Sequence, residues 1–269
     1  MTGALRRKEL RPLVVRPIHH GRGRPPTEPP VLVWLRLRDA SPRALREVDR
    51  IVQASIALAD QEGPTWLSMR HLATALATGT TSLYRYVKGK DELLELMADA
   101  VNGESPSPNE PIPVAPTGDW RADLRLIARG RRNQFLRHPW LASQAMSRLA
   151  LGPNTLRAAE FASAVVAQLS ADATVAGSIL GAILGFVHGA VADELGELEA
   201  KRRTGVSEDE WRAQLAPYVR SVIDGGSYPN FAKVVIKADD LSYDQQFEFG
   251  LARLLDGIEA FVGQEPTTR

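Results

Sequence analysis

The sequence predicts an all-α protein in which a small N-terminal three-helix domain precedes a larger helical domain. From Leu45 onward, apolar residues recur at spacings of three and four, which is the period of an amphipathic helix. We find no run of alternating β-branched residues long enough for a sheet. One proline-rich stretch interrupts the helical pattern, and 269 residues with 44% hydrophobic content can build two cores.

Changes in composition divide the chain into four segments. Residues 1–42 are rich in Arg and Pro and are interpreted as a basic arm. Residues 43–102 hold the three-helix domain, and residues 103–118 contain five prolines, as is typical of a linker. Residues 119–264 form the larger helical domain.

The charge is unevenly distributed, although the net formal charge is only +1. Residues 1–90 contain 16 Lys and Arg against 7 Asp and Glu, whereas residues 91–269 contain 17 against 25. A basic front and an acidic rear suit a polyanion-binding module joined to a body that the polyanion repels. Because 12 of the 16 front cations precede residue 51, a solvated tail is the alternative explanation.

Cysteine is absent, which excludes disulfides, thiolate zinc sites and cysteine nucleophiles and fits a reducing compartment. The N-terminal residues interleave Arg, Lys and Glu and lack the uninterrupted apolar segment of a secretory signal. We therefore expect a cytoplasmic protein.

The first strong helical pattern begins at Leu45 and ends at Gly63 and Pro64. Its apolar positions step by three and four along one face: Leu45, Val48, Ile51, Val52, Ile56 and Ala59.

Two short helices joined by a tight turn follow. Ser68 is a good N-cap for the first, which turns Leu72, Ala73 and Leu76 inward. The turn at residues 77–79 contains a glycine, as such turns favour.

The second short helix, from Thr80 to Tyr86, directs Leu83 and the following Val87 toward the core. Its outward side chains are Thr80, Thr81, Ser82, Tyr84, Arg85 and Tyr86. An arginine can address guanine edges, a threonine methyl can touch thymine, and hydroxyls can hold phosphates. This pattern indicates a helix that reads a DNA groove.

The segment from Leu45 to Leu94, with its core Leu83-Tyr84-Arg85-Tyr86-Val87-Lys88-Gly89-Lys90, resembles the DNA-binding domain of the tetracycline-repressor (TetR) family. The resemblance implies that Met69 and Arg70 begin the first motif helix. It implies that Thr80–Tyr86 form the recognition helix and that Lys90 contacts a phosphate. One departure is Leu76-Ala77, where the family usually has Leu-Gly.

The resemblance also implies function. It implies a transcriptional repressor that binds a palindromic operator in double-stranded DNA as a homodimer and is released by a small-molecule effector. The two recognition helices would then lie about one DNA turn apart, roughly 34–36 Å. No enzymatic activity, catalytic residue, cofactor or metal is implied.

The basic arm contains Arg22 and Arg24 in the sequence Arg-Gly-Arg-Pro, which resembles the core of an AT-hook. Glycine lets an extended backbone lie in a narrow minor groove that attracts arginine. The alternative is a solvated tail.

Four glycines, Gly177, Gly181, Gly185 and Gly189, repeat every four residues within an uncharged stretch at residues 173–192. A membrane span fits the length and the small-residue spacing, but polar residues dilute the hydrophobicity and no aromatic belt flanks the stretch. We prefer close approach by a neighbouring helix or by a ligand, because four helical glycines cost roughly 4 kcal/mol relative to alanine.

The last helix carries a seam of apolar residues at Phe247, Leu251, Leu254, Ile258 and Phe261. It could be buried within one protomer. In the resembled family, however, two late helices of each protomer make a four-helix dimer interface. We therefore expect the following dimer contacts: Gly177, Gly181, Gly185, Phe247, Leu251, Leu254 and Ile258.

The resembled family usually encloses a small, often apolar or aromatic effector in its C-terminal domain. Residues that could line such a cavity, or could equally be plain core, are Phe135, Trp140, Met146, Phe161, Phe186 and His188. His138 before Pro139 is expected to end a helix, and His188 is expected to be a satisfied core histidine.

Two other classes of protein stay open as alternatives. An all-α hydrolase or metal enzyme would need convergent groups at ligand spacing, but the histidines are scattered apart from the pair at residues 19 and 20. A non-specific architectural DNA-binding protein would depend on the arm alone, and sequence-independent affinity would distinguish it.

Overall fold

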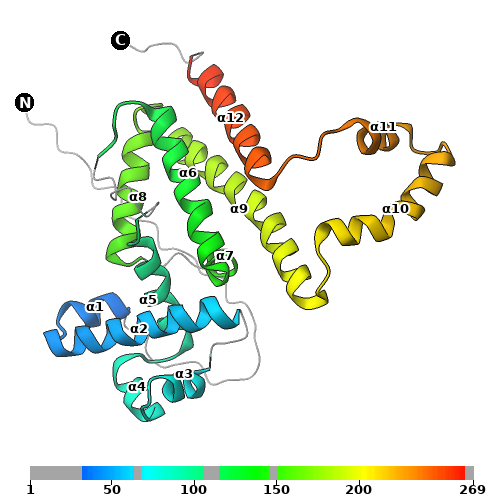
Figure 1. Cartoon of the computed structure of the whole chain (residues 1–269). Helices are drawn as coiled ribbons and strands as arrows, with labels where there is room; N and C mark the ends of the chain where they lie inside the picture. The colour runs from blue at the N-terminus through cyan, green and yellow to red at the C-terminus, as the bar shows by residue number, and fades with distance from the viewer. Residues whose placement is uncertain (1–31, 64–67, 106–114, 146–150, 264–269) are drawn as a thin grey trace, which may run out of the picture. The chain divides into compact units, whose positions relative to one another are not determined.

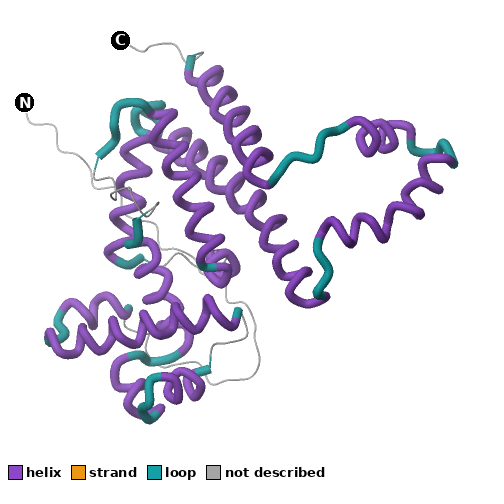
Figure 2. The backbone as a smooth tube through the Cα atoms, viewed as in Figure 1, coloured by secondary structure: helices purple, strands orange, loops and turns teal. Residues whose placement is uncertain are grey.

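The structure is a computed structural model that describes residues 32–63, 68–105, 115–145 and 151–263. Every regular element in these residues is a helix (Figure 2), which confirms the all-α prediction. The chain divides into two compact units, Met1–Asp39 and Ala40–Arg269.

In the first unit the described residues form one short helix, α1 (Val33–Arg38). This helix lies inside the segment that was expected to be a non-helical arm. The prolines of that arm lie at residues 12–30, before the helix, and at Pro42, after it, so none interrupts the helix.

In the second unit, α2 (Pro42–Glu62) packs against three helices that follow it: α3 (Met69–Ala75), α4 (Thr80–Tyr86) and α5 (Lys90–Asn102) (Figure 1). Ser41 caps α2 and Gly63 ends it with a φ of 76°. The predicted apolar face is buried from Val48 to Ala59, whereas Leu45 is 42% exposed and lies outside it. The predicted N-terminal domain is thus built around α2 and holds four helices, α2 to α5.

The larger group of helices is arranged around α9 (Figure 1). Helix α9 packs against α6, α7, α8 and α12, which span Trp120–Arg137, Pro139–Ala145, Pro153–Val166 and Tyr243–Val262. The inward stripe of α9 (Ala173–Thr204) is Ile179, Ile183, Val187 and Val191.

Helices α10 (Glu208–Asp224) and α11 (Pro229–Lys237) connect α9 to α12 and contain no buried residue. They pack on each other, and neither packs as extensively on any other helix. Large apolar side chains are exposed along them, namely Trp211, Tyr218, Phe231, Val234, Val235 and Ile236.

Helix α5 is bonded to the start of α8. The buried Asp99 carboxylate accepts hydrogen bonds from the Thr155 amide at 2.8 Å and from its hydroxyl at 2.9 Å. A Cβ at Gly103 would come within 2.6 Å of the Asn154 side chain, so the two helices approach closely there. The α5–α8 contact therefore lies across the expected boundary at residues 103–118.

Among the described helices, α9 alone is long and apolar enough to cross a membrane by length and composition. In the structure the same helix carries the central packing contacts with α6, α8 and α12.

The turn between α3 and α4 uses an alanine where glycine was expected to serve. Ala77 has a φ of 50°, the left-handed conformation that costs an alanine roughly 1–2 kcal/mol. Gly79 instead has extended backbone (φ −83°) and precedes α4. Ala77 therefore takes the place of the glycine that the resembled family has at this position.

We expect Ala77→Gly to raise the free energy of unfolding by about 0.5–1 kcal/mol, because the relieved strain exceeds the added entropy of the unfolded chain. The control Ala57→Gly, on the exposed side of α2, should lower it by about 1 kcal/mol. Urea denaturation of both variants measures these changes. A lower free energy of unfolding in Ala77→Gly would show that the backbone of Ala77 is not strained.

Candidate functional site

Helices α3 and α4 form a helix-turn-helix around a small apolar core. Leu72 and Ala73 of α3 are buried, as are Leu83 of α4 and the following Val87. The Ser68 hydroxyl accepts a hydrogen bond from a backbone amide at 3.0 Å and caps α3 at the predicted position. This core fixes which side of α4 faces outward.

The outward side of α4 carries the side chains that were expected to contact bases and phosphates. Thr80, Thr81, Ser82, Tyr84 and Arg85 are exposed, and Tyr86 is half-buried. Tyr84 is 46% exposed. Neither Tyr84 nor Arg85 is packed into the interior, which is the condition that a groove-reading helix has to meet.

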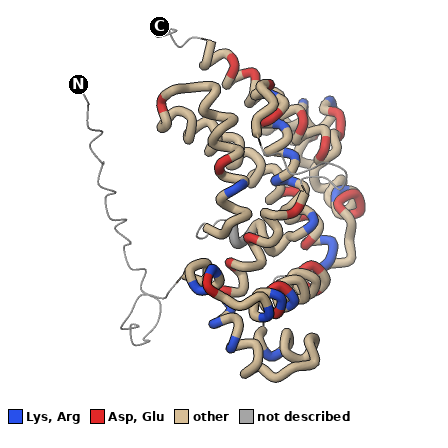
Figure 3. The backbone as a smooth tube through the Cα atoms, turned by 90° about the vertical axis from the view of Figure 1, so that its left-hand side faces the viewer, with Lys and Arg blue, Asp and Glu red and all other residues tan. Residues whose placement is uncertain are grey.

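The same surface is positively charged. From Ser68 to Lys90 the chain contains four cations and no acid (Figure 3). Arg70 and Lys90 are exposed, and Met69 is half-buried beside them at the start of α3. Lys90 begins α5, so a lysine and free helix amides lie together, a combination that suits phosphate.

Arg22 and Arg24 lie outside the described residues, so their contact with the minor groove stays a prediction.

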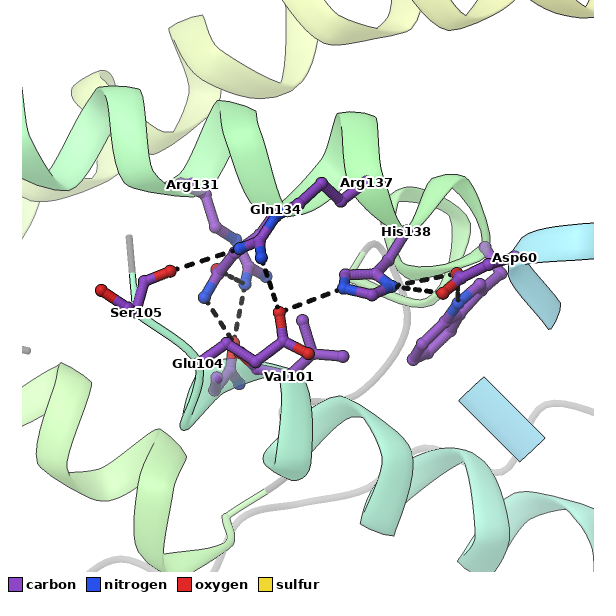
Figure 4. Close-up of polar contacts among 10 residues, drawn as sticks. Asp60, Val101, Glu104, Ser105, Arg131, Gln134, Arg137 and His138 are labelled. Carbon is purple, nitrogen blue, oxygen red and sulfur yellow. Dashed lines mark hydrogen bonds and ion pairs between the residues drawn. The ribbon is translucent and has the colours of Figure 1, made fainter. Parts of the chain in front are cut away.

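A cluster of polar contacts joins α2, the end of α5 and the corner between α6 and α7 (Figure 4). We call it the junction. His138 lies at its centre and is 7% exposed. Its Nδ1 lies 2.9 Å from Asp60 of α2, and its Nε2 lies 3.1 Å from Glu104, just after α5. The Trp140 indole also donates to Asp60, at 2.9 Å.

Both ring nitrogens of His138 thus face carboxylates. Burial by itself would lower the pKa of His138, but the hydrogen bonds and charges of Asp60 and Glu104 outweigh it and raise the pKa to about 9. Burial would raise the pKa of Glu104, yet His138 and Arg137 lower it. The histidine is therefore a cation at neutral pH, held between two anions.

Helix α6 holds the last turn of α5 through further contacts in the junction (Figure 4). The Gln134 amide donates to the Val101 carbonyl at 3.1 Å. The Arg137 guanidinium lies 3.1 Å from the Glu104 carboxylate and donates to the Ser105 carbonyl at 3.3 Å. Movement of α6 would therefore be transmitted to α5.

The sequence did not reveal the junction. His138 ends α6 before Pro139, as predicted, but its partners Asp60 and Glu104 lie 78 and 34 residues away in the chain. No local spacing marks pairs that are so distant in sequence.

The candidates for effector contact do not all gather in one place. Phe135 on α6 is fully buried, and the ring of His188 on α9 lies 4.9 Å from it. Trp140 belongs to the junction, and Phe161 is buried on α8. Met146 lies outside the described residues.

Phe186 faces α12. Its ring lies 5.4 Å from that of Phe247, and a Cβ at Gly250 would come within 2.6 Å of it. We therefore assign Phe186 to the packing between α9 and α12, because its ring occupies the space that Gly250 leaves.

His188 departs from the expectation of a satisfied core histidine. Its Nδ1 lies 2.7 Å from the Leu184 carbonyl oxygen. Its Nε2 is buried and has no hydrogen-bond partner, the one such side-chain atom in the described part of the chain. A buried polar atom without a partner is uncommon and needs an explanation.

The glycine ladder lies on the outer face of α9. Gly177, Gly181, Gly185 and Gly189 are exposed, and a Cβ at any of them would meet no atom within 4 Å. The ladder therefore points away from the interior, and no other described helix makes the close approach that it permits.

An open groove of about 430 Å³ runs between α9 and α12. It is lined by Thr174, Val175, Ser178, Ile179, Ala182, Arg253, Leu254, Gly257, Ile258 and Phe261. The lining is mostly apolar or small, which is typical of a surface that another protein chain covers.

The apolar seam expected along the last helix divides into a buried part and a part that lines the groove. Phe247 and Leu251 are 2% and 0% exposed, so the prediction that they contact a partner is wrong; their side chains already fill the protomer's own core. Ile258 is 7% exposed at the floor of the groove, and Leu254 and Phe261 line it.

Comparison with known proteins places these features in a family. The family model described as "Tetracyclin repressor-like, C-terminal domain" matches residues 112–262, more than half of the chain. The HTH-type transcriptional repressor DrrR1 of Streptomyces coeruleorubidus is 40% identical, over 83% of this chain and 81% of the relative. An HTH-type transcriptional regulator of Saccharopolyspora erythraea is 35% identical, over 88% and 94%.

Solved structures agree with the sequence comparisons. The TetR family protein ActR of Streptomyces coelicolor, in complex with actinorhodin, has a TM-score of 0.68 and 30% identity. The similarity covers 81% of this chain and 98% of that one.

The raised pKa of His138 predicts how stability depends on pH. The contribution of its ion pairs is fully present below the unfolded pKa of about 6.5 and is lost as pH rises through about 9. We expect wild type to exceed His138→Gln in unfolding free energy at pH 6, by about 3 kcal/mol at most, and to lose this advantage by about pH 10. Denaturant titrations across this range measure the difference. Asp60→Asn should reduce this dependence of the unfolding free energy on pH. If the unfolding free energies of wild type and His138→Gln changed with pH in parallel, the predicted contribution of the His138 ion pairs would be contradicted.

Proposed function

Since this chain belongs to the TetR family of helix-turn-helix transcriptional regulators, we propose that it is a one-component repressor. It binds a palindromic operator as a homodimer, and a small-molecule effector releases it. The observation that carries this proposal is the exposed outward face of α4, held by the buried Leu83 and Val87.

In this proposal α4 enters the major groove. Arg85 addresses guanine edges, and the hydroxyls and methyls of Thr80 and Thr81 approach bases at the start of the helix. Tyr84, Ser82 and Tyr86 add contacts along the same helix. Phosphates are held by Arg70 and Lys90, with Met69 beside them, and Arg22 and Arg24 of the arm reach the minor groove.

A second copy of the chain covers the groove between α9 and α12 and the glycine ladder beside it. Two exposed rows of small residues allow helices to approach closely, and the apolar groove supplies the buried area. The exposed apolar side chains of α10 and α11, which lie between α9 and α12 in sequence, support an assembly larger than one protomer.

The effector binds in the helical body near Phe135, and its binding is transmitted to α4 through α5. Support comes from the junction, where α6 holds both α5 and α2. The similar protein ActR was solved with actinorhodin bound, which is consistent with a small-molecule effector here.

The proposal places the protein in the cytoplasm, without a membrane span and without enzymatic activity. Packing of α9 against four other helices favours a core and interface role for it over a membrane role. An enzyme and an architectural DNA-binding protein are the alternatives. Selection of bound fragments from a random DNA pool tests the proposal, since a recovered palindrome supports it and sequence-independent recovery contradicts it.

Arg85→Ala should weaken binding to the selected operator by about tenfold to a hundredfold, since one good base contact contributes about 1–3 kcal/mol. Binding to random DNA should change much less. Arg157→Ala, which removes an exposed arginine from α8, is the matched control and should leave both affinities unchanged. Fluorescence anisotropy with both DNAs measures these effects. An equal loss on both would mean that Arg85 reads no base.

Gly181→Leu should convert the dimer to a monomer that binds an operator half-site weakly, because the new side chain occupies the space a partner helix needs. The variant should remain folded, since leucine is the better helix former by about 0.8–1 kcal/mol. Sedimentation equilibrium gives the mass, and Ala158→Leu on the exposed side of α8 is the control. A dimer persisting in Gly181→Leu would count against this interface.

A further inference from the structure

Arg131 on α6 is an arginine that the proposed DNA contacts and the dimer do not use. Its Nη1 donates to the Asn102 side chain at 2.8 Å and to the Gln134 side chain at 3.2 Å (Figure 4). Its guanidinium carbon lies 4.3 Å from the centroid of the Phe135 ring. All three neighbours are uncharged.

The other arginines of α6 that form ion pairs provide a contrast. Arg121, Arg129, Arg132 and Arg137 each contact at least one carboxylate within the described residues. Arg131 contacts none there. Burial lowers the pKa of Arg131 to about 10, and no neighbouring acid opposes that effect.

A desolvated cation without an anion is costly, and buried charges in proteins are generally paired or bind a ligand. The C-terminal end of α5 at Asn102 supplies only the partial negative charge of a helix terminus. The guanidinium thus lacks the planar, two-oxygen acceptor that it matches best.

His188 provides a second, independent observation at the same ring. Its contact with the Leu184 carbonyl requires a proton on Nδ1, so Nε2 of the neutral ring is an acceptor. That acceptor is buried without a partner, and the imidazole lies 4.9 Å from Phe135. A donor and an acceptor in need of partners therefore lie beside one aromatic ring.

We propose that Arg131 binds the anionic group of the effector and that His188 Nε2 accepts a hydrogen bond from a hydroxyl of the same molecule, with Phe135 contacting the apolar part between them. The chemical class is an aromatic hydroxy acid. This inference rests on the proposed function, because it names the ligand that would release the DNA.

The hydrogen bonds of Arg131 also connect the anion site to α5. Arg131 donates to Asn102, Asn102 donates to the Thr155 hydroxyl at 2.9 Å, and Thr155 donates to Asp99 at 2.9 Å. An anion that draws the guanidinium toward itself weakens the first of these bonds. One of the bonds that hold the end of α5 to α6 is then weakened, while the bonds from Gln134 and Arg137 remain.

The test uses the full chain and three probes: 6-hydroxy-2-naphthoic acid, its methyl ester and 2-naphthoic acid. Calorimetry should show that wild type binds the acid at least about tenfold more tightly than the ester, as expected for a charge-assisted pair. Arg131→Gln should abolish that preference. Arg129→Gln, which removes an exposed arginine from the same helix, should retain it. His188→Phe should weaken binding of the hydroxy acid and leave 2-naphthoic acid unaffected.

The melting temperature of Arg131→Gln shows whether Arg131 serves to bind a ligand or to stabilise the fold. Arg131→Gln should melt at the same temperature as wild type or higher, because it removes a desolvated charge. A lower melting temperature, equal affinity for acid and ester, no binding of the acid, or a preference that survives Arg131→Gln would each overturn the inference. Operator binding by the ligand-free protein is measured in parallel. If ligand-free wild type does not bind an operator, the proposed function is contradicted. If it binds the operator but shows no preference for the acid over the ester, only this inference is contradicted.

Discussion

The structure depends on how the last turn of α5 is held. It ends the helix that follows α4, the proposed recognition helix, and it is held by hydrogen bonds on two sides. Asp99 caps α8, and α6 reaches it through Gln134 and the ion pairs around His138. Because these bonds are buried or half-buried, moving α5 means exchanging several polar partners at once.

Helix α9 is packed by other helices on one face only, among the residues that the structure describes. Its inward face is a row of β-branched residues packed against α6, α8 and α12. Its outward face carries four glycines, and among the described residues no atom lies within 4 Å of a Cβ added at any of them. Each of these glycines lowers helix stability by about 1 kcal/mol relative to alanine, a cost that close packing of another helix would offset. The inner face thus explains the fold of the protomer, and the outer face explains why two protomers are proposed.

Charge has two separate uses in this chain. On the helix-turn-helix, Arg70, Arg85 and Lys90 are exposed, and the proposed function gives them DNA as a partner. In the body, most arginines of α6 are paired with carboxylates and hold helices together. Arg131 fits neither use, since it is desolvated and its partners are neutral. Its environment is that of a ligand site.

The sequence by itself determined the features that depend on neighbouring residues: the helical class, the Ser68 cap, the end of α2 at Gly63 and the outward face of α4. These follow from spacing and local backbone preference, which act within a few residues. The tertiary structure alone decided the rest. It paired His138 with residues 78 and 34 positions away, buried Phe247 and Leu251 in the protein core, and gave Arg131 no acidic partner among the described residues. An apolar stripe shows that a helix is buried on one face, but only packing shows which neighbour covers it.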